Sequence, residues 1–158
     1  MKRTITTAAL CLLLAGLAEQ AQARIKLTTL PERETVRVDI KNGRFTLVEE
    51  ERTVNLQGGR NQVDFSWSNI SIDKDSIVFR VIKADGEVNV LNTNYPNNEN
   101  ALYWTVSAAQ AGPAVIRISY LIGNMSATAS YQGIVENDEK TMLLQTYMTV
   151  QNTSGEDF

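Results

Sequence analysis

The sequence predicts an all-β protein built from antiparallel β-sandwich-like units. Apolar residues recur at every second position almost throughout the chain after residue 23, and helical spacing is nearly absent there. Turn signals rich in Gly, Asn and Asp separate these stretches at spacings of about 8–12 residues, which is typical of sandwiches and barrels. No stretch after residue 23 approaches the roughly 20 apolar residues of a membrane-spanning helix, so we expect no membrane span.

Residues 1–23 have the features of a secretory signal peptide. A positive start at residues 2–3 precedes an apolar stretch over residues 5–17, and Ala21 and Ala23 supply the small side chains that signal peptidase requires. We therefore expect cleavage after Ala23 and a periplasmic or secreted bacterial protein.

Composition closes several kinds of chemistry to the mature chain. It contains no histidine, and its only cysteine, Cys11, lies in the signal, which argues against zinc sites, cysteine nucleophiles and Ser-His-Asp triads. Removing 23 of the 158 residues leaves 135, with 13 of the 15 Lys and Arg, 17 of the 18 Asp and Glu, and a net charge of −4. This sign disfavours nucleic acid as a partner. We expect no cofactor and no metal.

The strands are predicted from alternation and from short apolar runs. They cover residues 36–40, 45–56, 63–67, 77–82, 88–91, 101–107, 114–122, 126–135 and 141–150. The tight-turn signal Gly58-Gly59 predicts a β-hairpin between the second and third strands. In the last strand, apolar residues at 142, 144, 148 and 150 alternate with polar ones, so one face requires a core.

Residues 92–100 are the strongest candidate for a linker, because they are rich in Asn and include Pro96. The sequence therefore predicts two units, a sandwich-like N-terminal domain over residues 24–96 and a second β domain over residues 97–158. Both are expected to be immunoglobulin-like or related.

Several stretches resemble the mucoidy-inhibitor-like family of secreted bacterial β-rich proteins, whose two domains have no assigned molecular function. The matching residues are 48–61, 73–77, 88–91, 118–121, 126–131, 140–142 and 151–158. The chain departs from the family at Ala127 and Ala129, where Trp and Pro are frequent, and it lacks the long coiled coil of many members. The family's Gly-Glu-Asp-aromatic motif is followed by further strands, whereas this sequence stops at Phe158, so the resemblance implies an N-terminal piece or a truncated relative.

Two carboxylate clusters suggest chemistry, and both have simpler structural interpretations. The run over residues 49–51 fits half of an acid/base or metal site, but successive strand residues point to opposite faces, which favours a solvated strand or a charged, protected edge. Asp73-Lys74-Asp75-Ser76 offers spaced oxygen ligands for calcium, but Val78 stands where such a loop needs Gly, which favours an Asp-capped turn.

Aromatic residues provide the candidate binding surface. Tyr95, Tyr103 and Trp104 fit a sugar-stacking platform, although adjacent strand residues such as Tyr103 and Trp104 must face opposite ways. Trp67 alternates in phase with Val63 and Phe65 and is expected in the core.

The favoured function is that of an exported, non-enzymatic interaction or cell-envelope-associated protein. Its partner is expected to be another protein or a second copy, bound through an exposed strand edge, with polysaccharide as a further possibility. A carbohydrate-binding module is the first alternative, and a carboxylate-based hydrolase is the second.

Overall fold

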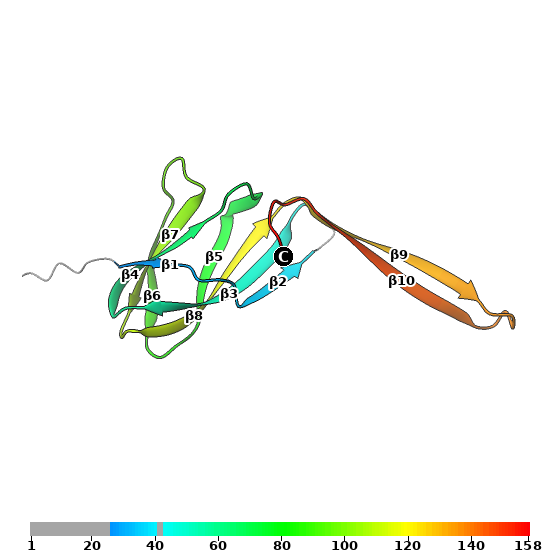
Figure 1. Cartoon of the computed structure of the whole chain (residues 1–158), viewed down its shortest axis with the longest axis horizontal. Helices are drawn as coiled ribbons and strands as arrows, with labels where there is room; N and C mark the ends of the chain where they lie inside the picture. The colour runs from blue at the N-terminus through cyan, green and yellow to red at the C-terminus, as the bar shows by residue number, and fades with distance from the viewer. Residues whose placement is uncertain (1–25, 41–42) are drawn as a thin grey trace, which may run out of the picture.

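The computed structural model describes residues 26–40 and 43–158, and every regular element in these ranges is a β-strand (Figure 1). The predicted all-β fold is thereby confirmed. The predicted signal over residues 1–23 lies outside the described residues. The strands are β1 (Lys26–Thr29), β2 (Thr35–Asp39), β3 (Thr46–Leu56), β4 (Gly59–Ser66), β5 (Ile72–Ala84), β6 (Val88–Asn94), β7 (Ala101–Ala108), β8 (Gly112–Ile122), β9 (Met125–Val135) and β10 (Met142–Asn152).

Two four-stranded sheets form a sandwich. One sheet has the order β1-β4-β7-β6 and the other β2-β3-β8-β5. Neighbouring strands are antiparallel except β1, which runs parallel to β4. The alternation in the sequence matches the burial, since β7 and β8 bury every second side chain almost along their whole length.

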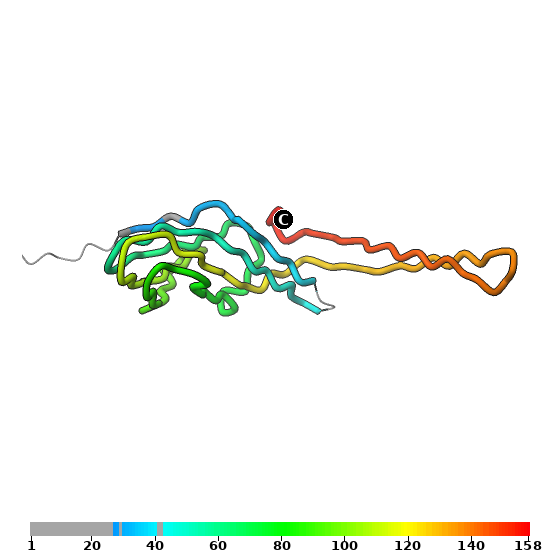
Figure 2. The backbone as a smooth tube through the Cα atoms, turned by 90° about the horizontal axis from the view of Figure 1, so that it is seen from below, coloured from blue at the N-terminus to red at the C-terminus, as the bar shows by residue number. Residues whose placement is uncertain are grey.

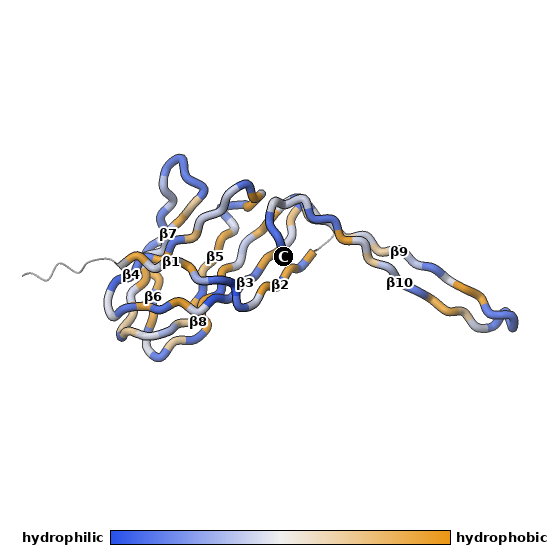
Figure 3. Tube along the Cα trace, viewed as in Figure 1, coloured by the Kyte–Doolittle hydropathy of each residue, from blue (hydrophilic) through white to orange (hydrophobic). Residues whose placement is uncertain are grey.

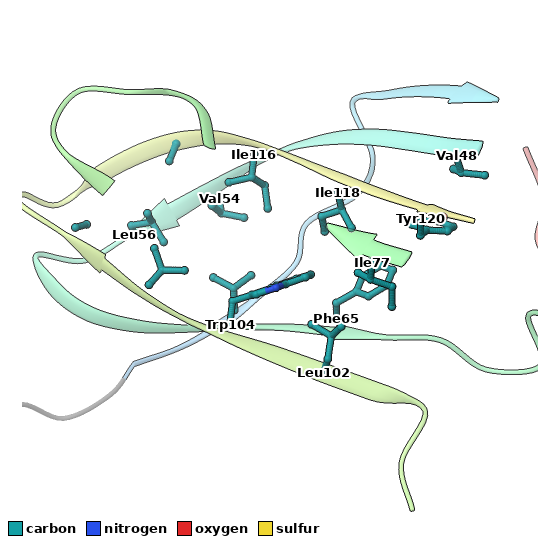
Figure 4. Close-up of a cluster of buried hydrophobic side chains, with 14 of the residues drawn as sticks. Val48, Val54, Leu56, Phe65, Ile77, Leu102, Trp104, Ile116, Ile118 and Tyr120 are labelled. Atoms are coloured by element: carbon teal, nitrogen blue, oxygen red, sulfur yellow. The ribbon is translucent and has the colours of Figure 1, made fainter. Parts of the chain in front are cut away.

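The core lies between the two sheets, where inward side chains interdigitate (Figure 4). Trp104 reaches from β7 into this layer, and its ring centroid is 4.6 Å from that of Phe79. Ile116 and Ile118 on β8 face it with no exposed surface. Each fully buried side chain of this size stabilises the fold by about 1.5–3 kcal/mol. This core holds the two sheets in place, and with them the site residues that their strands carry.

The predicted hairpin at Gly58-Gly59 is wrong, because β3 and β4 belong to opposite sheets and the turn crosses between them. Alternation indicates which face of a strand is buried, and it does not identify the neighbouring strand. The turn is closed by Asn61, a fully buried side chain that accepts a hydrogen bond from the Gln57 amide and donates one to the Gln57 carbonyl, both at 2.8 Å. Only Gly59 of the two glycines has positive φ, at 92°.

The predicted boundary at Pro96 does not divide the strands into two units. The residues around it connect β6 to β7, which are neighbours in one sheet, and β7 and β8 lie inside the two sheets that the earlier strands form. The described residues up to Ile122 therefore form one sandwich. The Asn-rich composition that predicted a linker belongs to a hairpin loop in which Asn98 adopts positive φ.

The last two strands leave the sandwich. β9 and β10 pair with each other in an unbroken antiparallel register from Met125↔Asn152 to Val135↔Met142. They form a long hairpin, here named the arm, that projects from one end of the sandwich (Figures 1 and 2). The chain after β10 returns to the sandwich, where the amide of Ser71 donates to the carbonyl of Ser154 at 3.3 Å.

Candidate functional site

The carboxylate run on β3 is divided between the two faces of a central strand. Glu49 and Glu51 lie on the outer face, where they pair with Arg37 and Arg117 at 3.3 and 2.5 Å. Glu50 points inward and has no exposed surface. The expectation of an edge strand is wrong, because β3 lies between β2 and β8. The expectation of a solvated face holds in part for Glu49 and Glu51, which are partly exposed, and not for Glu50.

Glu50 is the buried member of a charge cluster made of Arg33, Glu50, Arg52 and Glu156, whose other three side chains are partly exposed. Its Oε2 lies 2.6 Å from Arg33 Nε, and its Oε1 accepts from Arg52 Nη2 at 2.9 Å and from Nε at 3.2 Å. Arg33 also donates to Glu156 in the C-terminal segment, and its guanidinium lies 5.7 Å from the ring centroid of Phe158. Two arginines thus compensate the charge of Glu50, as a buried ion requires.

A cleft of about 540 Å³ opens beside this cluster. Its walls combine aromatic, aliphatic and charged side chains: Leu30, Arg33, Arg52, Asp64, Phe65, Trp67, Ile70, Ile72, Tyr120 and Glu156, with Ser66 and Ser68. Burial raises the pKa of the Tyr120 hydroxyl, and the charge of Glu50 raises that pKa further. Because Arg33 engages both Glu50 and Glu156, these carboxylates serve to hold the C-terminal segment against the sandwich.

The structure does not gather the predicted aromatic platform on one surface. Trp104 is 2% exposed and belongs to the core, which corrects its assignment to the surface. Tyr103, on the opposite face of β7, is half-buried and accepts a hydrogen bond from Asn94. Tyr95 is exposed and donates to the carbonyl of Lys74 at 3.4 Å. Trp67, expected in the core, packs at its margin and lines the cleft.

The Asp73 segment forms a capped turn at a β-bulge. The side chain of Asp73 accepts from the amide of Asp75 at 3.2 Å, and the hydroxyl of Ser76 donates to the Asp73 carbonyl at 2.5 Å. The pairing of β5 with β8 shifts register between Asp73 and Val78. The interpretation as an Asp-capped turn is confirmed.

The arm presents a second candidate surface, because its register places most of its apolar side chains on one face and most of its polar ones on the other. One face, here named the apolar face, carries Met125, Ala127, Ala129, Tyr131, Gly133, Val135, Met142, Leu144, Thr146, Met148, Val150 and, at its base, Asn152. The other, the polar face, carries Ser126, Thr128, Ser130, Gln132, Ile134, Leu143, Gln145, Tyr147, Thr149 and Gln151. Figure 3 shows hydrophobic segments along both strands of the arm.

The apolar face is open to solvent and carries no charge. Met148 is 69% exposed and Tyr131 is 68% exposed, and from Thr128 onward every residue of β9 and β10 is exposed. Neither strand contains Asp, Glu, Lys or Arg. Among the described residues β9 and β10 pair only with each other, which leaves their outer edges unpaired. Sequence reasoning treated these strands as parts of a second domain; their lack of charge was the signal that could have distinguished them.

Within the described ranges no three Asp or Glu side chains gather as a group that could hold a metal ion. No helix in that part of the chain is long and apolar enough to cross a membrane. No protein-family model, curated protein or solved structure matches the chain.

Proposed function

We propose that this chain is an exported, non-enzymatic interaction protein that binds a protein partner through the apolar face of the arm. The observation that carries the proposal is the uncharged apolar surface displayed on a projecting two-stranded hairpin. Soluble proteins rarely expose a contiguous apolar surface of this kind unless it binds something.

The physical chemistry of the arm supports this proposal. An isolated two-stranded hairpin is marginally stable in water, because it buries little apolar surface for the backbone that it orders. The polar face carries mainly Ser, Thr and Gln, which water solvates, although Leu143 and Ile134 are also exposed on it. On the apolar face, Met148, Leu144 and Val150 are stabilised only when another apolar surface covers them. A sheet-forming partner would complete the arm in the way that a second layer completes a sandwich.

The sandwich fixes the position of the arm at its base. Met125 packs against the core, and the amide of Thr153 donates to the carbonyl of Asn124 at 2.9 Å, where the two strands of the arm meet the sandwich. The charge cluster then fastens the segment after β10 through Glu156. Export is part of the proposal because residues 1–23 have the features of a secretory signal, and the resemblance to the mucoidy-inhibitor-like family supports a loose connection with the cell envelope.

Site-specific photocrosslinking in the native bacterium tests the proposal. A photoreactive residue at Leu144 samples the apolar face, and one at the adjacent Gln145 samples the polar face as a matched control. We expect a discrete adduct from position 144 and none from position 145. Absence of adducts from both positions, or equal diffuse labelling, would contradict an interaction through this face.

Carbohydrate binding is a second candidate function. The cleft is a better candidate site for it than the predicted platform of Tyr95, Tyr103 and Trp104, which the structure does not gather on one surface. Trp67 presents part of its ring in a cavity of about 540 Å³ that Arg33 and Asp64 also line, and aromatic faces with polar neighbours suit sugar rings. Calorimetric titration with a panel of oligosaccharides checks this function. Binding that is lost in Trp67→Leu and kept in Tyr103→Phe would support it, and no heat of binding in the unmodified protein would dismiss it.

A further inference from the structure

The apolar face has a distinct relief, with large side chains on one strand and small ones on the other. Met148 on β10 lies opposite Ala129 on β9, and Val150 lies opposite Ala127. Both pairs therefore place the larger side chain on β10 and the smaller one on β9. The face consists of a ridge along β10 and a groove along β9.

Two further pairs toward the tip depart from this relief. Leu144 lies opposite Gly133, although the sulfur of Met142 would be 2.8 Å from a Cβ at that glycine and so already covers it. Between these pairs the sizes are reversed, because Tyr131 on β9 lies opposite Thr146 on β10. Ridge and groove thus exchange strands at one position of the face.

We propose that the partner of the arm is a second copy of this chain, packed apolar face to apolar face about a two-fold axis that runs along the arm. This inference rests on the proposed function of the arm as an interaction device. Rotation about that axis places β10 of one copy over β9 of the other at the same height. Met148 then meets the partner's Ala129, and Tyr131 meets the partner's Thr146, so a large side chain faces a small one along the middle of the arm. At the tip, Val135 meets the partner's Met142, and both of these side chains are large.

The other face-to-face arrangement does not fit the relief. A two-fold axis across the arm, perpendicular to its strands, places β10 over β10 and β9 over β9. Ridge would then meet ridge, which leaves voids along both grooves, and close-packed interfaces do not tolerate such voids. The pairs formed by Met148 with Ala129 and Val150 with Ala127 therefore select the parallel arrangement, with both sandwiches at the same end.

Charge and area are consistent with an identical partner that binds weakly. The apolar face has no charge, so nothing on it repels its own copy. Strands of 11 residues at about 3.4 Å per residue give a face about 35 Å long and, with two strands, about 10 Å wide. Two such faces cover about 700 Å², less than the roughly 1,200–2,000 Å² of stable complexes. We therefore expect a dissociation constant in the micromolar range.

Sedimentation of the mature chain tests the proposal with a matched pair of variants. Met148→Lys puts a charge on the apolar face, and Thr149→Lys puts the same charge on the polar face. We expect dimers at micromolar concentration that weaken at least tenfold in Met148→Lys and persist in Thr149→Lys. Equal weakening in both variants would indicate pairing through strand edges and would overturn the face-to-face arrangement.

Exchanging the large and the small residue of one pair tests which residues of the two copies meet. Met148→Ala and Ala129→Met should each weaken the dimer, and the double variant should restore it, because the large residue again faces the small one. Failure of the double variant to recover, with circular dichroism unchanged, would overturn the packing.

The relative orientation of the two arms can be measured separately with spin labels. The mature chain lacks cysteine, so Asn137→Cys introduces a single labelling site in the exposed loop at the tip of the arm. Parallel arms bring the two labels within about 25 Å, whereas arms related by the crossed axis separate them by about 35 Å or more. A long distance would overturn the proposed axis. A chain that stays monomeric at 100 μM while Leu144 still gives a discrete crosslink to a different protein would overturn the second copy and leave the interaction function standing.

Discussion

The Nε of Arg33 lies 2.6 Å from the Oε2 of Glu50, whose side chain has no exposed surface. Arg33 precedes β2 and also binds Glu156 in the segment that follows the arm. One guanidinium thus ties the beginning of the sandwich, its central strand and the base of the arm together.

Glu50→Ala should destabilise the protein by about 3–5 kcal/mol, because it leaves Arg33 and Arg52 partly buried without their carboxylate. Glu49→Ala, one residue away on the outer face, removes an exposed pair with Arg37 and a long hydrogen bond of 3.5 Å from the Ser119 hydroxyl, and it should cost less than about 1 kcal/mol. Urea denaturation of both variants measures the difference. Similar midpoints for the two would contradict the inward position of Glu50.

Gly155→Ala should detach the C-terminal segment from the sandwich. A Cβ at this position would lie 2.3 Å from the carbonyl oxygen of Asn69, and the backbone φ of 88° already disfavours any other residue. Amide exchange at Ser71, which donates to the Ser154 carbonyl, should accelerate at least tenfold. Gly112→Ala is the control, since a Cβ there meets nothing within 4 Å, and an unchanged Ser71 rate in Gly155→Ala would contradict the docking.

Gly59→Val should destabilise the turn between the sheets by about 1–3 kcal/mol through backbone strain alone. Its φ is 92°, yet a Cβ there would meet no atom within 4 Å, so crowding at the Cβ does not contribute. Gly58→Ala is the control, because its Cβ would make an ordinary 3.7 Å contact with the amide nitrogen of Ala111. Thermal denaturation should separate the two variants, and a melting temperature unaffected by Gly59→Val would contradict the turn conformation.

Most of the fold could be predicted from the sequence because side-chain alternation follows directly from the geometry of a strand. Val63 and Phe65, for example, are inward as expected. Strand partners could not be predicted, since alternation is the same whether a strand turns back on its neighbour or crosses to the opposite sheet. The Gly58-Gly59 turn and the loop around Pro96 were misinterpreted for this reason.

The candidate sites were harder to predict because they depend on residues far apart in the chain. Glu50 lies between two other glutamates, and such a run normally indicates exposure; only Arg33, 17 positions earlier, and Arg52 make its burial possible. Trp104 has the residue type of a binding platform, but its strand buries the face that carries it. The arm differs, since the lack of charge in β9 and β10 is visible in the sequence itself.

Alkaline pH should destabilise the sandwich through Tyr120. Burial, with the charge of Glu50, raises its pKa in the folded state above the ordinary value of about 10, so the folded protein holds this proton more tightly than the unfolded chain. The free energy of unfolding should therefore be unaffected by this group below about pH 10 and should fall as pH rises above it, by up to about 1.4 kcal/mol per pH unit. Urea unfolding from pH 8 to 11 should show a shallower decline in Tyr120→Phe. The control, Tyr147→Phe on the exposed arm, should keep the full slope, and equal slopes in both variants would contradict the assignment.

Salt should strengthen the dimer, which is the reverse of what a contact between opposite charges would show. The loop at the tip of the arm carries Glu136, Asp138, Glu139 and Lys140, a net charge of −2 per copy. The hydroxyl and amide of Thr141 hydrogen-bond to the carboxylate of Asp138 and lower its pKa, which keeps it charged. Parallel arms bring two such tips together, and their repulsion is screened as the Debye length falls to about 10 Å at 0.1 M salt.

Sedimentation between 20 and 300 mM NaCl should show association increasing several-fold. Lys140→Glu should enlarge this dependence, whereas the same change at Lys83, in the part of β5 that pairs with the beginning of β8, should not alter it. A dissociation constant that is independent of salt, or that rises with it, would show that the tips do not meet and that the arms are not parallel.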